Sequence, residues 1–386
     1  MILLWYFGRL VVIEILFIGF KFFDPAELFK KVQVMKLAII SILIAVLFSS
    51  SGSLARDHRG GGGPPTRAHT AITTKPVKFE PSNIELDLPS RVSIEIDDDE
   101  RIIKSNGIPN HLVGRFPNCG NPHQIGEQNF RFEVTTKPSK SWRPSELDSG
   151  WAFGVAVNGV PFEPLAAEWW RGYRDSEWRY EALSGAVPLG PDESQAHVQP
   201  GGKYHYHGLP MGLLEKEGIS KTSHSKIIGW AADGFPIYAL YGFADKKSAA
   251  GGIKEFKSSF KLKTGERPGG WNSPKGVYDG AFIADYEYVE NSGDLDKCNG
   301  MDTSTPDFPN GTYVYFLTSD WPIIPRCFIG SPDSSFNMRG SGGPPGKPGR
   351  KPADCPRRGG MGPGHGPGGH GPGGHGHGPG HRPPPR

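Results

Sequence analysis

The amino-acid sequence predicts a mostly β protein: an antiparallel β-sandwich or barrel-like domain with few short helices. Short segments rich in β-branched and aromatic residues recur along the middle of the chain, and turn-forming residues separate them. Two of these regions share the same sequence pattern, which indicates an internal duplication. The 54 Gly and 37 Pro residues gather near the two ends of the 386-residue chain, so the folded part is shorter than the whole.

The N-terminal region predicts export. Residues 35–55 have the charged start, apolar run and small residues before Arg56 that are typical of a signal peptide. Residues 1–34 are interpreted either as a mis-assigned upstream extension or as a membrane segment, and residues 56–78 as a Gly/Pro linker. We therefore expect a secreted, extracellular or periplasmic protein; the alternative is a protein anchored to a membrane by its uncleaved N-terminal segment.

The folded domain is expected over residues 79–335. Its strands are predicted, in order, at residues 84–88, 91–96, 129–134, 282–289 and 311–317. Two short helices are predicted at residues 164–171, where Pro164 stands at the start, and at residues 211–216.

The internal repeat spans about residues 154–207 and 229–316. The pattern G-x-A-x-(N/D)-G-φ-P-φ, where φ is an apolar residue, occurs at 154–162 and again at 229–237. Each copy is followed by P-x-G-x-Y-x-Y-x, at 200–207 and at 309–316. We expect the tyrosines of both copies to be buried. The first copy has His205 and His207 where the second has Val314 and Phe316, so only the first copy can bind a metal ion.

The alternation Tyr204-His205-Tyr206-His207 predicts a strand with both histidines on one face. Same-face Cβ atoms lie roughly 7 Å apart on a strand, which allows two imidazoles to converge on one ion. His197 precedes a Pro-Gly-Gly sequence that should turn the chain back toward this strand. The sequence thus predicts a metal site at His197, His205 and His207.

Three further residues are candidate ligands, and each has an ordinary structural explanation. His111 and His123 stand in predicted loops, where histidines are commonly surface residues. Asp233 stands in a predicted turn, where its side chain can bond its own backbone.

The segments 197–210, 228–238 and 294–300, together with a later Cys327-Phe328, resemble the YHYH-domain protein family. The resemblance covers roughly residues 100 to 332. It implies the domain type and leaves the reaction open.

The four cysteines are expected to form disulfides if the protein is exported. The pairing of Cys298 with Cys327 rests on their both lying in the family-like region. Cys119 with Cys355 follows only by elimination, and either of these two can instead be free. No C-x-x-C spacing points to thiolate metal chemistry.

Residues 336–386 are predicted to be a disordered Gly/Pro/His tail. Its repeated histidines can bind copper, zinc or nickel weakly, or the segment can act as a solubilising or adhesive tail. The net charge of +3 is too small to indicate a nucleic acid partner.

The sequence therefore predicts an exported domain that binds copper or zinc through strand histidines, with an unknown substrate and reaction. It lacks the additional histidine motifs of multicopper oxidases and the glutamate spacing of cupins. The alternative is a non-enzymatic module that binds extracellular carbohydrate or peptide through a surface of Tyr and Trp residues, with the histidines forming only hydrogen bonds.

Overall fold

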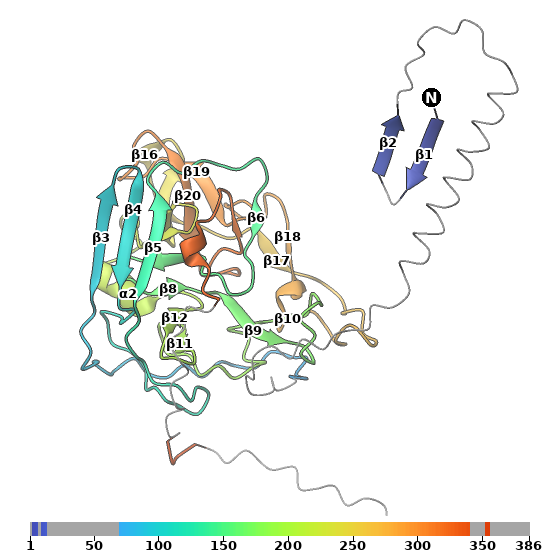
Figure 1. Ribbon diagram of the computed structural model, residues 1–386. Coiled ribbons are helices and arrows are strands. Elements are labelled where there is room, and N and C mark those ends of the chain that lie inside the picture. Colours follow the sequence, from blue (N-terminus) through green and yellow to red (C-terminus); the bar gives the residue numbers. More distant parts are fainter. Residues whose placement is uncertain (1, 7–8, 14–68, 340–351, 356–386) are drawn as a thin grey trace, which may run out of the picture. The chain divides into compact units, whose positions relative to one another are not determined.

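The computed structural model describes residues 2–6, 9–13, 69–339 and 352–355 (Figure 1). The expected signal peptide, the expected linker up to residue 68 and most of the expected tail lie outside these residues. The chain divides into two compact units, Met1–Thr66 and Arg67–Arg386. In the first unit, β1 (Ile2–Tyr6) and β2 (Arg9–Ile13) pair as an antiparallel hairpin.

No helix among the described residues is both long enough and apolar enough to cross a membrane.

The second unit is mostly β, as predicted. A three-stranded antiparallel sheet is formed by β3 (Val92–Asp97), β4 (Glu100–Ser105) and β5 (Phe130–Thr135). Along β5 every second side chain is buried, which is the pattern of a strand with one face on the core. Phe132, Val134 and Ile103 of this sheet belong to the main hydrophobic core.

The main sheet has eight strands, and it carries the candidate site at one end. Their order across the sheet is β11 (Ala196–Val198), β12 (Tyr204–Tyr206), β8 (Pro161–Phe162), β7 (Gly154–Ala156), β13 (Gly229–Ala231), β14 (Pro236–Ala239), β20 (Thr312–Leu317) and β19 (Gly300–Thr303). The sheet is mixed, because β12 runs parallel to β8 and β14 runs parallel to β20. The prediction of antiparallel pairing holds for its other neighbours.

The strand order is symmetric about the β7 and β13 pair, as expected of a duplication. Each half holds one hairpin with an N/D-G turn, followed by a second hairpin whose tyrosine strand pairs in parallel with the first. The registers agree as well. Tyr206 lies opposite Phe162 in the first half, and Tyr315 lies opposite Ile237 at the corresponding positions of the second. The two sequence patterns therefore occupy equivalent places in the sheet.

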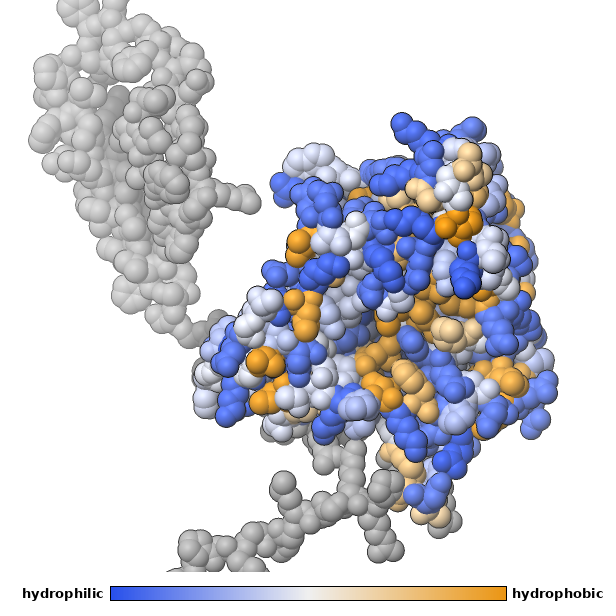
Figure 2. Space-filling model, turned by 180° about the vertical axis from the view of Figure 1, so that it is seen from behind, coloured by the Kyte–Doolittle hydropathy of each residue, from blue (hydrophilic) through white to orange (hydrophobic). Residues whose placement is uncertain are grey.

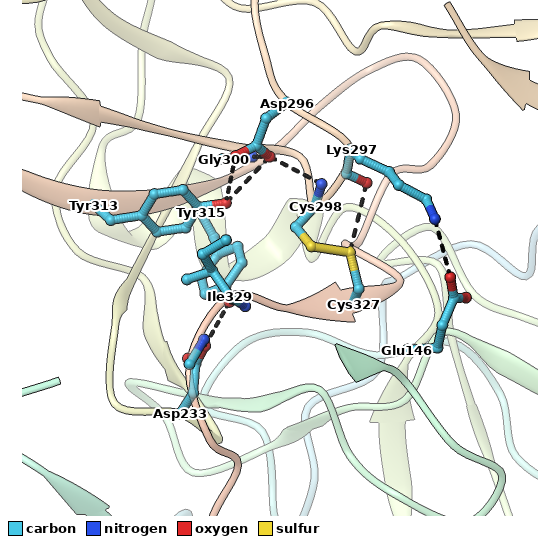
Figure 3. Close-up of a disulfide and its surroundings, with 11 residues drawn as sticks. Glu146, Asp233, Asp296, Lys297, Cys298, Gly300, Tyr313, Tyr315, Cys327 and Ile329 are labelled. Carbon is cyan, nitrogen blue, oxygen red and sulfur yellow. Dashed lines mark hydrogen bonds and ion pairs between the residues drawn. A yellow bond between two sulfur atoms is a disulfide. The ribbon is translucent and has the colours of Figure 1, made fainter. Parts of the chain in front are cut away.

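The tyrosines are buried, and one tyrosine of each copy forms a hydrogen bond with the N/D-G turn of that copy, although the direction of the bond differs. The Tyr206 hydroxyl accepts a hydrogen bond from Asn158 Nδ2 at 3.0 Å. The Tyr315 hydroxyl donates to Asp233 Oδ2 at 2.5 Å, and it accepts from the Ile329 amide (Figure 3). These buried partners explain why the tyrosines recur in both copies.

The opposite faces of the two tyrosine strands differ. The pairing of β19 with β20 places Met301 opposite Val314, which corresponds to the pairing of His197 with His205. Met301, Val314 and Phe316 are buried in a separate hydrophobic cluster. Apolar packing therefore fills the second copy at the place where the first copy gathers three histidines.

Shorter elements surround the two sheets. They are β6 (Ser145–Glu146) with β21 (Cys327–Phe328), β9 (Leu165–Trp169) with β10 (Arg179–Glu181), β15 (Tyr241–Asp245) with β16 (Ser248–Glu255), β17 (Phe260–Leu262) with β18 (Tyr286–Tyr288), the helix α2 (Met211–Glu217), and the 3-10 turns η1 (Ile283–Asp285) and η2 (Ser334–Phe336). Of these, α2 confirms the helix predicted at residues 211–216.

Three sequence-based assignments are wrong. Residues 165–169 form strand β9 instead of a helix, because they pair with β10. The predicted strand at 84–88 is reduced to one bridge between Ile84 and Val113. Within the predicted strand at 282–289, Phe282 forms a single bridge with Tyr180, η1 follows, and only Tyr286–Tyr288 is strand.

Two disulfides are present. Cys298 bonds Cys327, as expected, and Cys119 bonds Cys355 (Figure 3 shows the first). The second disulfide connects residues 352–355 covalently to the segment around Cys119.

Residues on both sides of the expected domain contact the folded unit. Residues 69–78, assigned to the linker, contact the folded unit: the Lys75 amide bonds the Ser184 carbonyl. Phe336 and Met338, assigned to the tail, are buried in the main core.

Candidate metal centre

The three histidines are brought together by the hairpin of β11 and β12. His197 lies directly opposite His205, and His207 follows one residue after β12 on the same face as His205. The turn between the strands needs Gly201 and Gly202, which have φ values of 95° and 88°. A Cβ atom on Gly202 would lie 2.8 Å from the Gly126 amide nitrogen. The Pro-Gly-Gly sequence thus forms the predicted turn.

The Nε2 atoms of the three imidazoles converge on one point. His205 Nε2 lies 3.0 Å from His207 Nε2, which lies 3.1 Å from His197 Nε2. The three potential ligand atoms all lie within 4.8 Å of one another. Nitrogen ligands of a tetrahedral zinc ion, at about 2.0–2.1 Å from the metal, are separated by roughly 3.3 Å. The cluster therefore has nearly the spacing of a metal site.

The surrounding carbonyl groups fix two of the tautomers. His197 Nδ1 lies 3.1 Å from the Leu189 carbonyl oxygen, and His205 Nδ1 lies 3.3 Å from that of Lys203. A carbonyl only accepts, so both Nδ1 atoms carry the proton and donate it. The Nε2 atoms of these two neutral imidazoles then present bare lone pairs to the centre.

His207 cannot donate a hydrogen bond to both His197 and His205. Its Nδ1 makes no hydrogen bond of normal geometry among the described residues, although the Pro164 backbone lies close enough to act on the ring. A proton on its Nε2 can bond one of the other two histidines and leaves two lone pairs facing each other at the second contact. Converging lone pairs of this kind are stabilised by a cation, so the donor set fits a metal ion.

Burial keeps these imidazoles neutral. Desolvation lowers the pKa of His197 to about 4. Desolvation also lowers the pKa values of His205 and His207 well below the ordinary value, and the neighbouring His197 lowers them further. At neutral pH protons therefore do not compete with a metal ion for the Nε2 atoms.

A buried ion pair lies beside the histidines. Lys203 Nζ and Glu163 Oε1 are 2.6 Å apart, and both side chains are buried. The amide of Gln199 donates to Glu163 Oε2 at 3.1 Å, and its nitrogen lies 3.5 Å from His205 Nε2. These residues link a carboxylate to the histidine cluster.

A cleft of about 750 Å³ opens beside the cluster. His197 and His207 line it, while His205 is fully buried behind them. The cleft is also lined by β9, which lies near β11 and β12 in Figure 1, and by residues 120–123 next to the Cys119–Cys355 disulfide. Its size suits a small organic ligand.

Comparison with known proteins identifies the family. The family model described as YHYH protein matches residues 131–330, more than half of the 386-residue chain. This chain belongs to the YHYH family. The matched region of the YHYH protein includes all three histidines and both copies of the internal repeat. Searches of curated proteins and of solved structures found no match.

The other candidate ligands of the YHYH domain lie outside the cluster. His111 Nε2 is 2.7 Å from the Tyr206 hydroxyl, on the opposite face of β12. Asp233 bonds Tyr315 and the Gly330 amide in the second copy. His123 lines the cleft without joining the histidines.

Sequence reasoning missed Glu163, Gln199 and Lys203, although the last two lie in the family-like segment 197–210. Glu163 follows the Pro161-Phe162 end of the first repeat. The only signal was that Glu163 is a polar residue next to an otherwise apolar strand.

Proposed function

We propose that the YHYH domain binds one transition-metal ion, copper or zinc, through Nε2 of His197, His205 and His207. The observation that carries this proposal is the convergence of three neutral imidazoles that lack enough protons to bond one another. Imidazole ligands suit both copper and zinc, and the cluster contains no thiolate.

The fourth coordination position would face the cleft, because His197 and His207 line it. An ion with three protein ligands and an open position supplies Lewis-acid chemistry if it is zinc, or redox chemistry if it is copper. We therefore propose that a small molecule in the cleft is what the ion acts on.

We propose that the polar residues beside the histidines hold one another in a fixed position. Lys203 holds Glu163 in place, and the Gln199 amide fixes the second oxygen of that carboxylate. Glu163 is thereby fixed as a carboxylate beside the histidines.

We propose that the protein works outside the cytoplasm. Two disulfides are consistent with an oxidising compartment, and residues 35–55 have the composition of a signal peptide. The alternative remains retention at a membrane by an uncleaved N-terminal segment.

A non-enzymatic binding module is the second candidate function. Trp142 and Trp271 are 87% and 76% exposed, which favours a recognition surface for carbohydrate or peptide. Figure 2 shows one face of the unit, on which hydrophobic side chains gather near the middle among hydrophilic ones. The tyrosines of the two repeats do not contribute to such a surface, because they are buried.

Metal analysis separates the two functions. The protein should be purified without an affinity tag and ended after Cys355, which removes the tail histidines and keeps the Cys119–Cys355 disulfide. We expect about one equivalent of copper or zinc in this protein. The pair of substitutions His205→Ala and His207→Ala should remove it.

The matched control is His224→Ala, which alters a half-buried histidine outside the cluster and should leave the metal content unchanged. Retention of one equivalent after loss of both strand histidines would place the metal elsewhere.

A further inference from the structure

A cationic side chain that forms no ion pair with the described residues lies in the cleft. Arg179 of β10 lines the cleft and is half-buried, and no carboxylate of the described residues lies within 4 Å of its guanidinium. Its Nε donates to the Ala166 carbonyl at 2.6 Å, and its Nη1 donates to Ser149 Oγ at 3.0 Å. Those two bonds fix the guanidinium, and Nη2 makes no such bond within the described fold.

The environment of the Arg179 guanidinium makes its positive charge less favourable. Desolvation and then the nearby Arg326 lower the pKa of Arg179, and Glu168, Glu181 and Asp148 raise it, with a net result of about 10. Arg326 is itself buried and is paired with Glu181 through its Nη2 at 2.9 Å, while its Nε and Nη1 have no hydrogen-bond partner in the described part of the chain. A buried cation that lacks a paired anion destabilises the protein, so the site is suited to an incoming anion.

The remaining charges of the cleft do not supply that anion. Glu163 is paired with Lys203, and Arg339 is paired with Asp148. Glu168 also lines the cleft but forms no ion pair with Arg179. Burial raises the pKa of the Glu168 carboxyl, while the Arg179 and Arg174 charges lower it.

Part of the remaining cleft wall is apolar. The Arg179 guanidinium stacks on the Trp169 ring, 4.4 Å from its centroid. Leu165, Leu189 and Trp151 contribute further apolar lining. The cleft therefore combines one fixed guanidinium with a surface that accepts a hydrophobic body.

We propose that the cleft binds a small carboxylate with an apolar or aromatic body, and that its carboxylate contacts Arg179 beside the histidine cluster. Arg179 and His207 line the same cleft, and the Arg179 charge acts on His207. The contact with Arg179 stands on its own, whereas a role for this ligand as the molecule acted on rests on the proposed metal function.

Binding to the metal-free, full-length protein tests the contact with Arg179. Isothermal titration at pH 8 with a chelator present should show saturable binding of benzoate and much weaker binding of its neutral analogue benzamide. Arg179→Gln should weaken benzoate binding by about tenfold or more, because a charge-assisted hydrogen bond is lost.

Arg179→Lys distinguishes loss of the charge from misfolding. It keeps the positive charge and should retain more affinity for benzoate than the glutamine variant. The matched control is Arg171→Gln, which removes an exposed arginine that also stacks on a tryptophan but does not line the cleft. It should bind benzoate as the unchanged protein does.

Equal affinity for benzoate and benzamide, or unchanged benzoate binding by a folded Arg179→Gln protein, would overturn the inference. Tighter binding of inorganic phosphate than of benzoate would also contradict it, because the apolar lining would then contribute nothing. Since no metal is present, these results do not depend on the metal proposal, which the metal content tests separately.

Discussion

Acid should destabilise the metal-free protein through its buried histidines. The change in the free energy of unfolding can be calculated for His197. Its pKa is about 4 in the folded protein and about 6.5 in an unfolded chain. The unfolded state therefore binds more protons between these values, and this contribution to stability is lost as the pH falls from above 6.5 toward 4.

The size of the effect follows from the two pKa values. The full difference of about 2.5 pH units corresponds to about 3.4 kcal/mol, of which about 2.5 kcal/mol is already lost at pH 4.5. This is an upper value for His197 alone, because its side chain meets solvent in the cleft. The lowered pKa values of His205 and His207 add loss of the same sign.

The comparison should be made between the unchanged protein and His197→Gln. Both are unfolded with urea at pH 7 and at pH 4.5, with a chelator present. The unchanged protein should lose about 2 kcal/mol more than the variant on acidification. Asp192, whose pKa burial raises to about 6, acts in the opposite direction in both proteins and cancels in the difference. Equal losses in the two proteins would refute the assignment of a buried, neutral His197.

Three further outcomes are expected. Replacing Cys298 and Cys327 by alanine should lower the free energy of unfolding by about 2–5 kcal/mol, and urea unfolding that shows no change would count against a structural disulfide. Tyr315→Phe should cost about 1.5–3 kcal/mol, because its hydroxyl bonds a carboxylate, whereas Tyr206→Phe should cost about 0.5–1.5 kcal/mol; a reversed order in urea unfolding would contradict these partners. The exported protein should begin near Arg56, and N-terminal sequencing that finds Met1 on the exported form would exclude cleavage there.

Much of the site could be predicted from sequence because strand alternation fixes which side chains share a face. His205 and His207 were placed on one face by that rule, and His197 was brought opposite by two glycines with positive φ. The duplication was predictable for a similar reason: both copies need the same turn residues and the same buried tyrosines.

The cleft could not be predicted, because its wall comes from segments far apart in the sequence. Arg179 and Trp169 meet in it only because β9 pairs with β10. Residues 165–169 contain Ala and Leu, which favour a helix, and this tertiary pairing overrides that local preference. Glu163 reaches the histidines only because β8 pairs with β12.

Anomalous diffraction from crystals of the protein ended after Cys355 tests the metal proposal most directly. Data collected on both sides of the copper and zinc absorption edges should show one peak, about 2.0–2.1 Å from Nε2 of His197, His205 and His207. A density map without such a peak after incubation with both metals, or a peak bound by other residues, would contradict a three-histidine metal centre in this YHYH domain.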